Sequence, residues 1–288
     1  MAERERKLIR SWLVQWAPDV RVHNFTRLGD GVSAHVYGVE YSTSRGRQRA
    51  ALRLVAAPVN LCLRESMVLN RLQSAGLPVP RCYGVKESAG KGCAMLLDWL
   101  PGHPVGRPQD VHTYVEQLAE LLVSIHQATL PSGLPKFRTV LNRTLRHAAE
   151  MPELAAVLQA IKEYPEVGGE VVLLHGDFWP GNLLFQRKVL TGVVDWSDAC
   201  TGPAAADVAN ARMELAWMWG MDAMLQFTEL YFAKAPIKAS HLAYWDLVAS
   251  LKPAMRAPYW GLKPATLRRL QESVRQMQDD ALLTLGRL

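Results

Sequence analysis

Residues 175–185 read HGDFWPGNLLF and follow the apolar run VVLL (171–174). The segment brings a histidine, an aspartate, a Pro-Gly pair and an asparagine close together. Four residues separate Asp177 from Asn182, and Asp195 follows thirteen residues after Asn182, in GVVDW. Because Asp and Asn are also common in ordinary turns beside Pro-Gly, the segment alone is compatible with either a turn or a chemical site.

The spacing beyond this segment favours the chemical interpretation. The short apolar segments LLF (183–185) and GVV (192–194) are predicted to pair as a hairpin, which would bring Asn182 and Asp195 together at its open end. An amide oxygen and a carboxylate form a hard-oxygen site suited to Mg²⁺. Asp177 precedes the hairpin and could orient an attacking hydroxyl or accept its proton. These are the roles that phosphoryl transfer from a nucleotide requires.

The rest of the chain divides into a region with strand-like patterns and a mainly helical region. Residues 22–55 show short alternating segments broken by Gly29, Gly31, Gly38 and Gly46, and two more strand-like pieces, 81–87 and 92–100, follow a helical segment at 61–75. After residue 102 the pattern is mainly helical, apart from the β-like island at 171–198. The expected helices cover 4–17, 61–75, 111–128, 140–163, 204–219, 221–233, 240–255 and 264–285.

Composition excludes several classes of protein. The 288 residues have 49% hydrophobic and 21% charged side chains, which is typical of a globular chain. A net charge of +6 permits a nucleic-acid partner, but the basic residues are scattered and no nucleic-acid motif is present. The charged N-terminus lacks an apolar signal core, and no run is long enough to span a membrane. The spacing of the four cysteines suggests neither a zinc site nor a disulfide framework, so we expect a reducing, cytoplasmic setting.

The segment HGDFWPGNLLF…GVVDW resembles the catalytic and metal-binding segment of the aminoglycoside phosphotransferase/choline kinase family. The H-x-D-x-x-x-x-N interval matches the kinase pattern, with His175-Gly176 in place of His-Arg. The resemblance implies an α+β, protein-kinase-like bilobal fold. Its N-terminal lobe, residues 1–98, would hold an antiparallel sheet plus a helix and bind nucleotide. Its largely helical C-terminal lobe, residues 99–288, would carry a small β hairpin, the catalytic residues and the acceptor site.

The same resemblance assigns residues upstream. It implies a strand turn over the phosphates in RLGDGVSAHVYGVE (27–40), with Gly29, Gly31 and Ser33, although the third glycine of the kinase pattern is absent. It places Arg53 as the phosphate-binding cation, where protein kinases carry Lys, and Glu65 as its helix partner. An arginine offers a planar fork to phosphate, so the two cations are not interchangeable.

The hinge between the lobes is implied to lie in CAMLLDWLPG (93–102). Leu97 takes the gatekeeper position, and the Asp98 carbonyl and the Leu100 amide would meet adenine. Asp207 is implied to support the catalytic loop, and we expect it to cap the start of the next helix. His175 is expected to orient the loop, His126 to be a packed helix histidine, and the roles of Phe178 and Trp179 are left open.

The predicted function is transfer of the γ-phosphate of ATP, or of GTP, to a small-molecule hydroxyl with Mg²⁺. Asp177 would be catalytic and Asn182 and Asp195 would hold metal. Residues 240–288 carry seven Lys/Arg and four Asp/Glu, which argues against a polycationic acceptor. The aromatic residues of the helical part could form a cage for a quaternary ammonium, stack on a sugar face or simply pack the core; they are Trp217, Trp219, Tyr244, Trp245, Tyr259 and Trp260. Nucleic-acid and membrane partners are not expected, and the chain would be a monomer or homodimer. The alternative is a nucleotide-binding regulatory pseudokinase.

Overall fold

The computed structural model describes residue 7 and residues 10–11, 13–14, 19–30, 34–44, 46–88, 92–164 and 170–286. Most of the helix expected at 4–17 therefore falls outside the described residues, as do Gly31 and Ser33. The chain forms two compact units. The first runs to Pro101 and also contains Thr191–Ser197, and the second contains Gly102–Leu190 and Asp198–Leu288.

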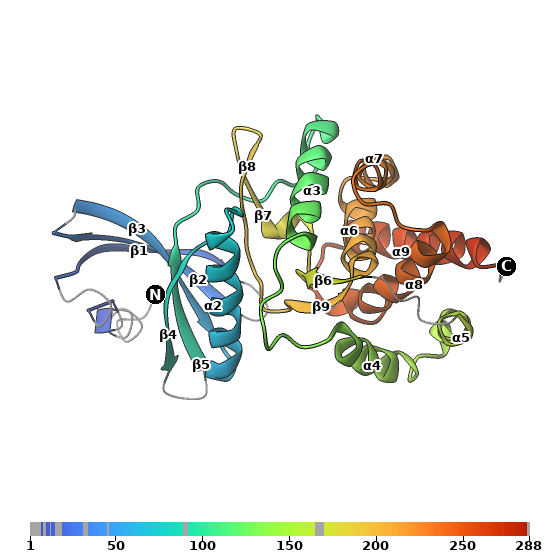
Figure 1. The fold of residues 1–288 in the computed structure, drawn as a ribbon, viewed down its shortest axis with the longest axis horizontal. Coiled ribbons are helices and arrows are strands. Elements are labelled where there is room, and N and C mark those ends of the chain that lie inside the picture. The colour runs from blue at the N-terminus through green and yellow to red at the C-terminus, as the bar shows by residue number, and fades with distance from the viewer. Residues whose placement is uncertain are drawn as a thin grey trace. The chain divides into compact units, whose positions relative to one another are not determined.

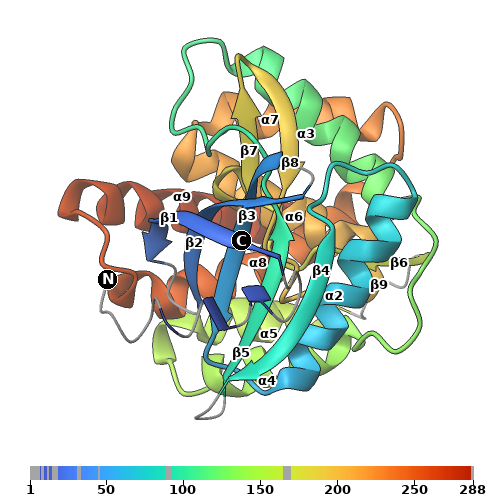
Figure 2. The ribbon, with the colours of Figure 1, turned by 90° about the vertical axis from the view of Figure 1, so that its left-hand side faces the viewer.

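The first unit is built on an antiparallel sheet with the strand order β1-β2-β3-β5-β4 (Figures 1 and 2). The bounds are β1 Arg21–Asp30, β2 Ala34–Thr43, β3 Gly46–Val55, β4 Cys82–Ser88 and β5 Gly92–Asp98, with helix α2 at Val59–Ser74. Alternate side chains on the central strands share one buried cluster: Tyr37, Val39, Ala50, Leu52, Ala94 and Leu96. This two-residue period is what a sheet with a buried face requires.

Helix α2 packs along β4 and β5 (Figure 2). Its buried positions recur at helical spacing and include Val68, Leu69 and Leu72, together with one charged residue, Glu65. A charged side chain on the apolar face of a helix requires a partner inside the fold. The helix therefore presents Glu65 toward the interior of the first unit.

Gly38 does not break a strand, contrary to the sequence-based expectation. It lies inside β2, opposite Ala51 of β3. A Cβ atom at this position would stand 2.9 Å from Cζ3 of Trp99, so the missing side chain makes room for the indole. The Arg49 guanidinium stacks over the same ring at 4.3 Å. Glycine is required here because the Trp99 ring lies close to the backbone, and not because the chain turns.

The second unit is mainly helical and holds two short sheets. Its helices are α3 Val111–His126, α4 Phe137–Ala148, α5 Ala155–Glu163, α6 Ala204–Met218, α7 Met221–Phe232, α8 Ala239–Arg256 and α9 Pro264–Thr284. Strand β6, Val171–Leu174, pairs with β9, Cys200–Pro203. Strand β7, Leu183–Gln186, pairs with β8, Val189–Val193, whose last residues belong to the first unit. The predicted hairpin is therefore confirmed.

Two elements differ from the sequence-based expectation. The single helix expected at 140–163 is two helices, because Pro152 starts a short 3₁₀ turn, Pro152–Leu154, between α4 and α5. The strand β9 was not expected, since its four residues, CTGP, carry no strand pattern of their own. Among the described residues, no helix is long and apolar enough to cross a membrane.

The cysteines also differ from the expectation. Cys62 of α2 and Cys93 of β5 form a disulfide with Cα atoms 6.7 Å apart, whereas Cys82 and Cys200 are free and buried. The sequence suggested no disulfide, which was wrong, and the argument for a reducing setting loses this support. The 31 residues between the two cysteines hid the pairing, because only the packing of α2 on the sheet brings them together.

This bond makes a countable prediction. Chain denatured without reductant should titrate two thiols, from Cys82 and Cys200, and four after reduction. Cys62→Ser should raise the unreduced count by one, because it releases Cys93, whereas Cys82→Ser should lower it by one. A chromogenic thiol titration in denaturant measures both changes, and four thiols in the unreduced wild-type chain would contradict the bond.

Candidate active site

Arg53 of β3 is buried between two carboxylates of the first unit. Its guanidinium donates to Glu65 Oε1 through Nη1 and to Asp195 Oδ1 through Nη2, the latter at 2.6 Å. Arg53 and Glu65 are only 6% and 5% exposed. Burial alone would lower the pKa of Arg53, but the charges of Glu65 and Asp195 raise it above its ordinary value. The structure thus brings together the pair expected from the sequence and adds Asp195 as a second partner.

The carboxylates of Glu65 and Asp195 also accept hydrogen bonds from the segment that follows β8. Glu65 Oε1 also accepts the backbone N–H of Trp196 at 3.2 Å, and Asp195 Oδ1 accepts the hydroxyl of Ser197 at 2.9 Å. Asp195 has a φ of 64°, a left-handed conformation that is uncommon for a residue with a side chain. Such strain persists where surrounding contacts impose it and clusters at functional sites.

In the second unit, Asp207 holds the backbone of the loop after β6. Its carboxylate accepts the N–H of His175 at 2.6 Å through Oδ2 and the N–H of Gly176 at 2.9 Å through Oδ1. Asp207 and His175 are both essentially fully buried. The implied supporting role of Asp207 therefore matches its geometry, but the expectation of a helix cap was wrong. α6 begins at Ala204, and Asp207 points from its first turn to the loop.

Gly176 has a structural requirement of its own. Its φ is 81°, and a Cβ atom would lie 2.3 Å from the carbonyl oxygen of Asp198. Any side chain here would force the two backbone segments apart. The position between His175 and Asp177 therefore requires glycine, because the backbone at Asp198 passes close to it.

Asp177 and Asn182 lie in direct contact. The amide Nδ2 of Asn182 donates to the backbone carbonyl of Asp177 at 2.9 Å and to its Oδ2 at 3.2 Å. Asn182 ends the 3₁₀ turn Pro180–Asn182, so the Pro-Gly pair bends the loop back on itself. With its nitrogen facing Asp177, Asn182 keeps its amide oxygen for another ligand.

Lys252 of α8 is a partner that the sequence did not predict. Its ammonium donates to Asp177 Oδ1 at 2.7 Å, although the two residues are 75 positions apart. Burial alone would lower the pKa of Lys252, but Asp177, Asp198 and Glu214 raise it above its ordinary value. No local pattern announces this contact, because it depends on where α8 packs.

The two aromatic residues of the loop differ in burial. Phe178 is fully buried, and its ring meets His175 edge to face at 5.9 Å. Its carbonyl accepts a hydrogen bond from the Asn210 amide at 3.1 Å. The Trp179 ring lies over Gly181, where a Cβ atom would be 2.3 Å from Cη2. Phe178 is thus a packing residue, whereas Trp179 is only partly buried.

His126, as expected, is a packed residue at the end of α3. Its Nδ1 is 2.7 Å from the Tyr231 hydroxyl, and its Nε2 lies 3.5 Å from Asp207 Oδ2. The side chain is 8% exposed. Its Nε2 makes no hydrogen bond within the described chain, so the imidazole is held through Tyr231 and packs beside Asp207.

Two of the expected hinge residues, Leu97 and Asp98, are the last residues of β5. Leu97 is buried near the end of β5, and the Asp98 carboxylate accepts the Tyr83 hydroxyl at 2.5 Å and the Arg81 N–H at 3.2 Å. The hydrogen bond to Asp98 is the main cause that raises the pKa of Tyr83 to about 12. Within the described part of the chain, no backbone carbonyl accepts the N–H of Leu100. This donor is therefore available to a ligand.

The remaining predicted residues are only partly described. Gly29 lies in β1 opposite Val36, at a register shift between Arg27 and Gly29. Gly31 and Ser33 lie outside the described residues.

Oxygen donors for a cation are present in both units. Asn182 offers its amide oxygen, and Asp195 Oδ2 accepts no hydrogen bond from the described residues. The described chain holds no cluster of three or more His, Cys, Asp or Glu side chains that could bind a metal alone. Each of these oxygens is of the hard kind that Mg²⁺ binds, alongside water and phosphate oxygens.

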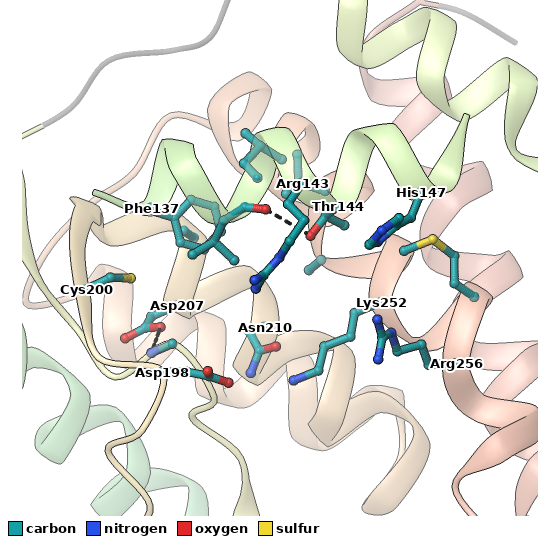
Figure 3. A pocket seen from close by; sticks show the side chains of 17 residues that line it. Phe137, Arg143, Thr144, His147, Asp198, Cys200, Asp207, Asn210, Lys252 and Arg256 are labelled. Atoms are coloured by element: carbon teal, nitrogen blue, oxygen red, sulfur yellow. Dashed lines mark hydrogen bonds between the residues drawn. The ribbon is translucent and has the colours of Figure 1, made fainter. Parts of the chain in front are cut away.

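A cavity of about 550 Å³ opens beside the loop (Figure 3). It lies within the second unit, and its wall includes Gly176, Asp198, Asn210 and Lys252. Its size is in the range of small-molecule sites. Lys252 lines the cavity and also donates to Asp177, so this lysine links the cavity wall to the carboxylate of the loop.

Glu214 of α6 is close enough to Asp177 and Lys252 for their charges to act on it. Its Oε2 accepts the indole N–H of Trp217 at 2.8 Å. Burial, with the charge of Asp177 as a further cause, raises the pKa of Glu214 to about 7. The carboxyl of Glu214 is thus close to half protonated at neutral pH.

This shift predicts a pH-dependent stability. A carboxyl whose pKa is raised by folding keeps its proton longer in the folded chain, so wild-type stability should fall as pH rises from about 4.5 to about 7. Glu214→Gln keeps an acceptor for Trp217 but cannot ionise. Relative to wild type it should gain up to about 3 kcal/mol between pH 4.5 and 8. Urea unfolding of both proteins at several pH values measures this, and parallel curves would contradict it.

Comparison with known proteins identifies relatives of two kinds. The homoserine kinase of Phenylobacterium zucineum is 29% identical over 173 residues, which cover 54% of this chain and 51% of that protein. The homoserine kinase of Pseudomonas aeruginosa is 27% identical over 206 residues, 62% of each chain. The chain thus spans between about half and three fifths of the length of these curated relatives.

The fold is that of the protein-kinase-like aminoglycoside phosphotransferases. A thermostable mutant of APH(4)-Ia, solved with ADP and hygromycin B, superimposes with a TM-score of 0.70. The alignment covers 97% of this chain and 98% of the other at 17% identity, so the likeness concerns the fold. The α+β, kinase-like fold expected from the sequence is confirmed. The model of the phosphotransferase enzyme family matches residues 24–240, three quarters of the chain, and the chain belongs to this family.

Proposed function

We propose that this protein transfers the γ-phosphoryl group of ATP to a hydroxyl group of a small molecule. The carrying observation is the loop in which Asp177 and Asn182 touch, held by Asp207 and placed at the edge of a cavity. In the reaction the acceptor oxygen forms a bond to the γ-phosphorus, the bond from that phosphorus to the bridging oxygen breaks, and ADP leaves. The hydroxyl proton passes to Asp177.

Asp177 is the proposed catalytic residue. Its carboxylate would orient the acceptor hydroxyl and take its proton as the new bond forms. Lys252 and Asn182 fix the two carboxylate oxygens through hydrogen bonds of 2.7 and 3.2 Å. Fixed orientation matters here because phosphoryl transfer depends mainly on positioning and charge neutralisation.

The nucleotide is proposed to bind the first unit, which corresponds to the expected lobe 1–98. Arg53, held by Glu65, would present its planar guanidinium to phosphate oxygens. The free N–H of Leu100 and the carbonyl of Asp98 would bind adenine, next to Leu97. Gly29, Gly31 and Ser33 are proposed to cover the phosphates, and the lobe 99–288 would supply the acceptor site.

Asn182 and Asp195 are the proposed ligands of Mg²⁺. Each has an oxygen that accepts no hydrogen bond from the described residues. The ion, when bound, would neutralise the phosphate charge that develops during transfer. The left-handed conformation of Asp195 and its contacts to Arg53 and Ser197 would keep the second oxygen turned away from these partners.

The names of the similar proteins suggest two different classes of acceptor molecule. The curated relatives are named homoserine kinases, whereas the structural neighbour was solved with hygromycin B. We propose a small-molecule hydroxyl without choosing between these names. A regulatory protein without transfer activity remains the alternative that kinetics must eliminate.

Asp177→Asn should lower kcat for phosphoryl transfer by about 10²- to 10⁴-fold, because the amide cannot accept the proton. The KM for ATP should change little, since Asp177 acts on the acceptor. The measurement is an ADP-release assay with a panel of hydroxyl compounds and Mg²⁺.

Asp222→Asn is the matched control, because Asp222 is an exposed carboxylate in the first turn of α7 in the same unit. It should retain wild-type rates. Transfer by Asp177→Asn at the wild-type rate would contradict the catalytic role. Wild-type protein that binds nucleotide and transfers to no acceptor would favour the regulatory alternative.

A further inference from the structure

The cavity beside Asp177 has a charge pattern that concerns the acceptor. Three cationic side chains line it, Arg143 from α4 and Lys252 and Arg256 from α8, together with His147 of α4. Arg143 reaches from its helix into the space, and Lys252 extends into it from the opposite helix (Figure 3). All four side chains belong to exposed residues and are therefore accessible to a ligand.

The cations differ in whether they are already neutralised. Lys252 is paired with Asp177 at 2.7 Å. In contrast, neither Arg143 nor Arg256 has a carboxylate within 4 Å among the residues that the structure describes. Two guanidinium groups therefore face the cavity without a counter-charge from the described chain. Guanidinium forks bind carboxylates and phosphates through paired hydrogen bonds.

The acidic side chains of the wall do not balance them. Asp207 is buried, and both of its oxygens accept backbone N–H groups of the loop. Asp198 is the other carboxylate of the lining. A polycationic acceptor would meet more positive than negative charge here, which opposes its binding.

The rest of the wall is apolar. Phe137, Val140, Leu141, Val248 and Met255 contribute hydrocarbon surface. An acceptor that fills this space therefore has a hydrocarbon part as well as a charged group. Small-molecule sites commonly combine an apolar wall with a few polar groups that fix orientation.

We infer that the acceptor is a small hydroxyl compound bearing an anionic group, carboxylate or phosphate, that binds Arg143 and Arg256 while its hydroxyl faces Asp177. This inference rests on the proposed phosphotransferase function and specifies the substrate class of the same site. The anion anchors one end of the acceptor, and the hydroxyl at the other end receives the phosphoryl group. A polycationic aminoglycoside is excluded from this class.

The test compares acceptors that differ in charge; all except kanamycin are small. Hydroxy acids such as glycerate, 4-hydroxybutyrate and homoserine form one arm, glycerol 3-phosphate the phosphate arm, glycerol the neutral arm, and choline and kanamycin the cationic arm. We expect kcat/KM for one anionic arm to exceed that of the neutral and cationic arms at least tenfold. Which anionic arm is preferred distinguishes carboxylate from phosphate.

Variants then locate the anion. Arg143→Gln and Arg256→Gln should each raise the KM for the preferred anion about tenfold or more, with a smaller effect on kcat, because the hydroxyl end is untouched. Arg146→Gln is the matched control, since Arg146 is exposed on α4 and does not line the cavity. Its KM should equal that of wild type.

A calorimetric titration of the same compounds, with a non-hydrolysable ATP analogue present, separates the two hypotheses. Anion binding that both arginine variants weaken, without transfer to any acceptor, supports an anion site at Arg143 and Arg256 but contradicts the proposed function and, with it, the identity of the anion as an acceptor. Transfer with a preference for neutral or cationic acceptors supports the function and overturns the inference. Anion binding that neither variant changes, or the absence of anion binding, also overturns it.

Discussion

The loop that precedes the proposed catalytic residue depends on one buried carboxylate, that of Asp207. Asp207 is 1% exposed, and its negative charge is accommodated because two backbone N–H groups donate to it. An ionised buried group without such partners would be strongly unfavourable. The same bonds fix the backbone at His175 and Gly176, which immediately precede Asp177. The position of the proposed catalytic carboxylate, Asp177, thus follows from the hydrogen bonds that the buried Asp207 requires.

Charge pairs also hold other proposed site residues within each unit. Arg53 lies between Glu65 and Asp195 in the first unit, and Lys252 binds Asp177 in the second. Removing one partner of a buried pair leaves the other uncompensated, so these residues are expected to depend on one another. Against this background the unpaired Arg143 and Arg256 stand out as cations that the described chain does not neutralise. The proposed acceptor supplies the missing negative charge.

Much of this could be predicted from the sequence, because it is encoded locally or by order along the chain. The Asp177–Asn182 contact follows from a five-residue interval, and the Arg53–Glu65 pair from a strand followed by a helix. Lys252 and Glu214 were missed because their contacts depend on how α6 and α8 pack. The Cys62–Cys93 bond was missed for a similar reason, since a helix and a strand bring the two cysteines together.

The central claim is transfer of phosphate to an acceptor, and ³¹P nuclear magnetic resonance observes it directly. Wild-type protein is incubated with ATP, Mg²⁺ and the panel of hydroxyl compounds, and the phosphorus spectrum is followed with time. The account predicts a new phosphomonoester resonance from one acceptor, growing in step with ADP and absent in Asp177→Asn. A spectrum in which ATP persists unchanged, or yields ADP and inorganic phosphate alone with every acceptor, would contradict it.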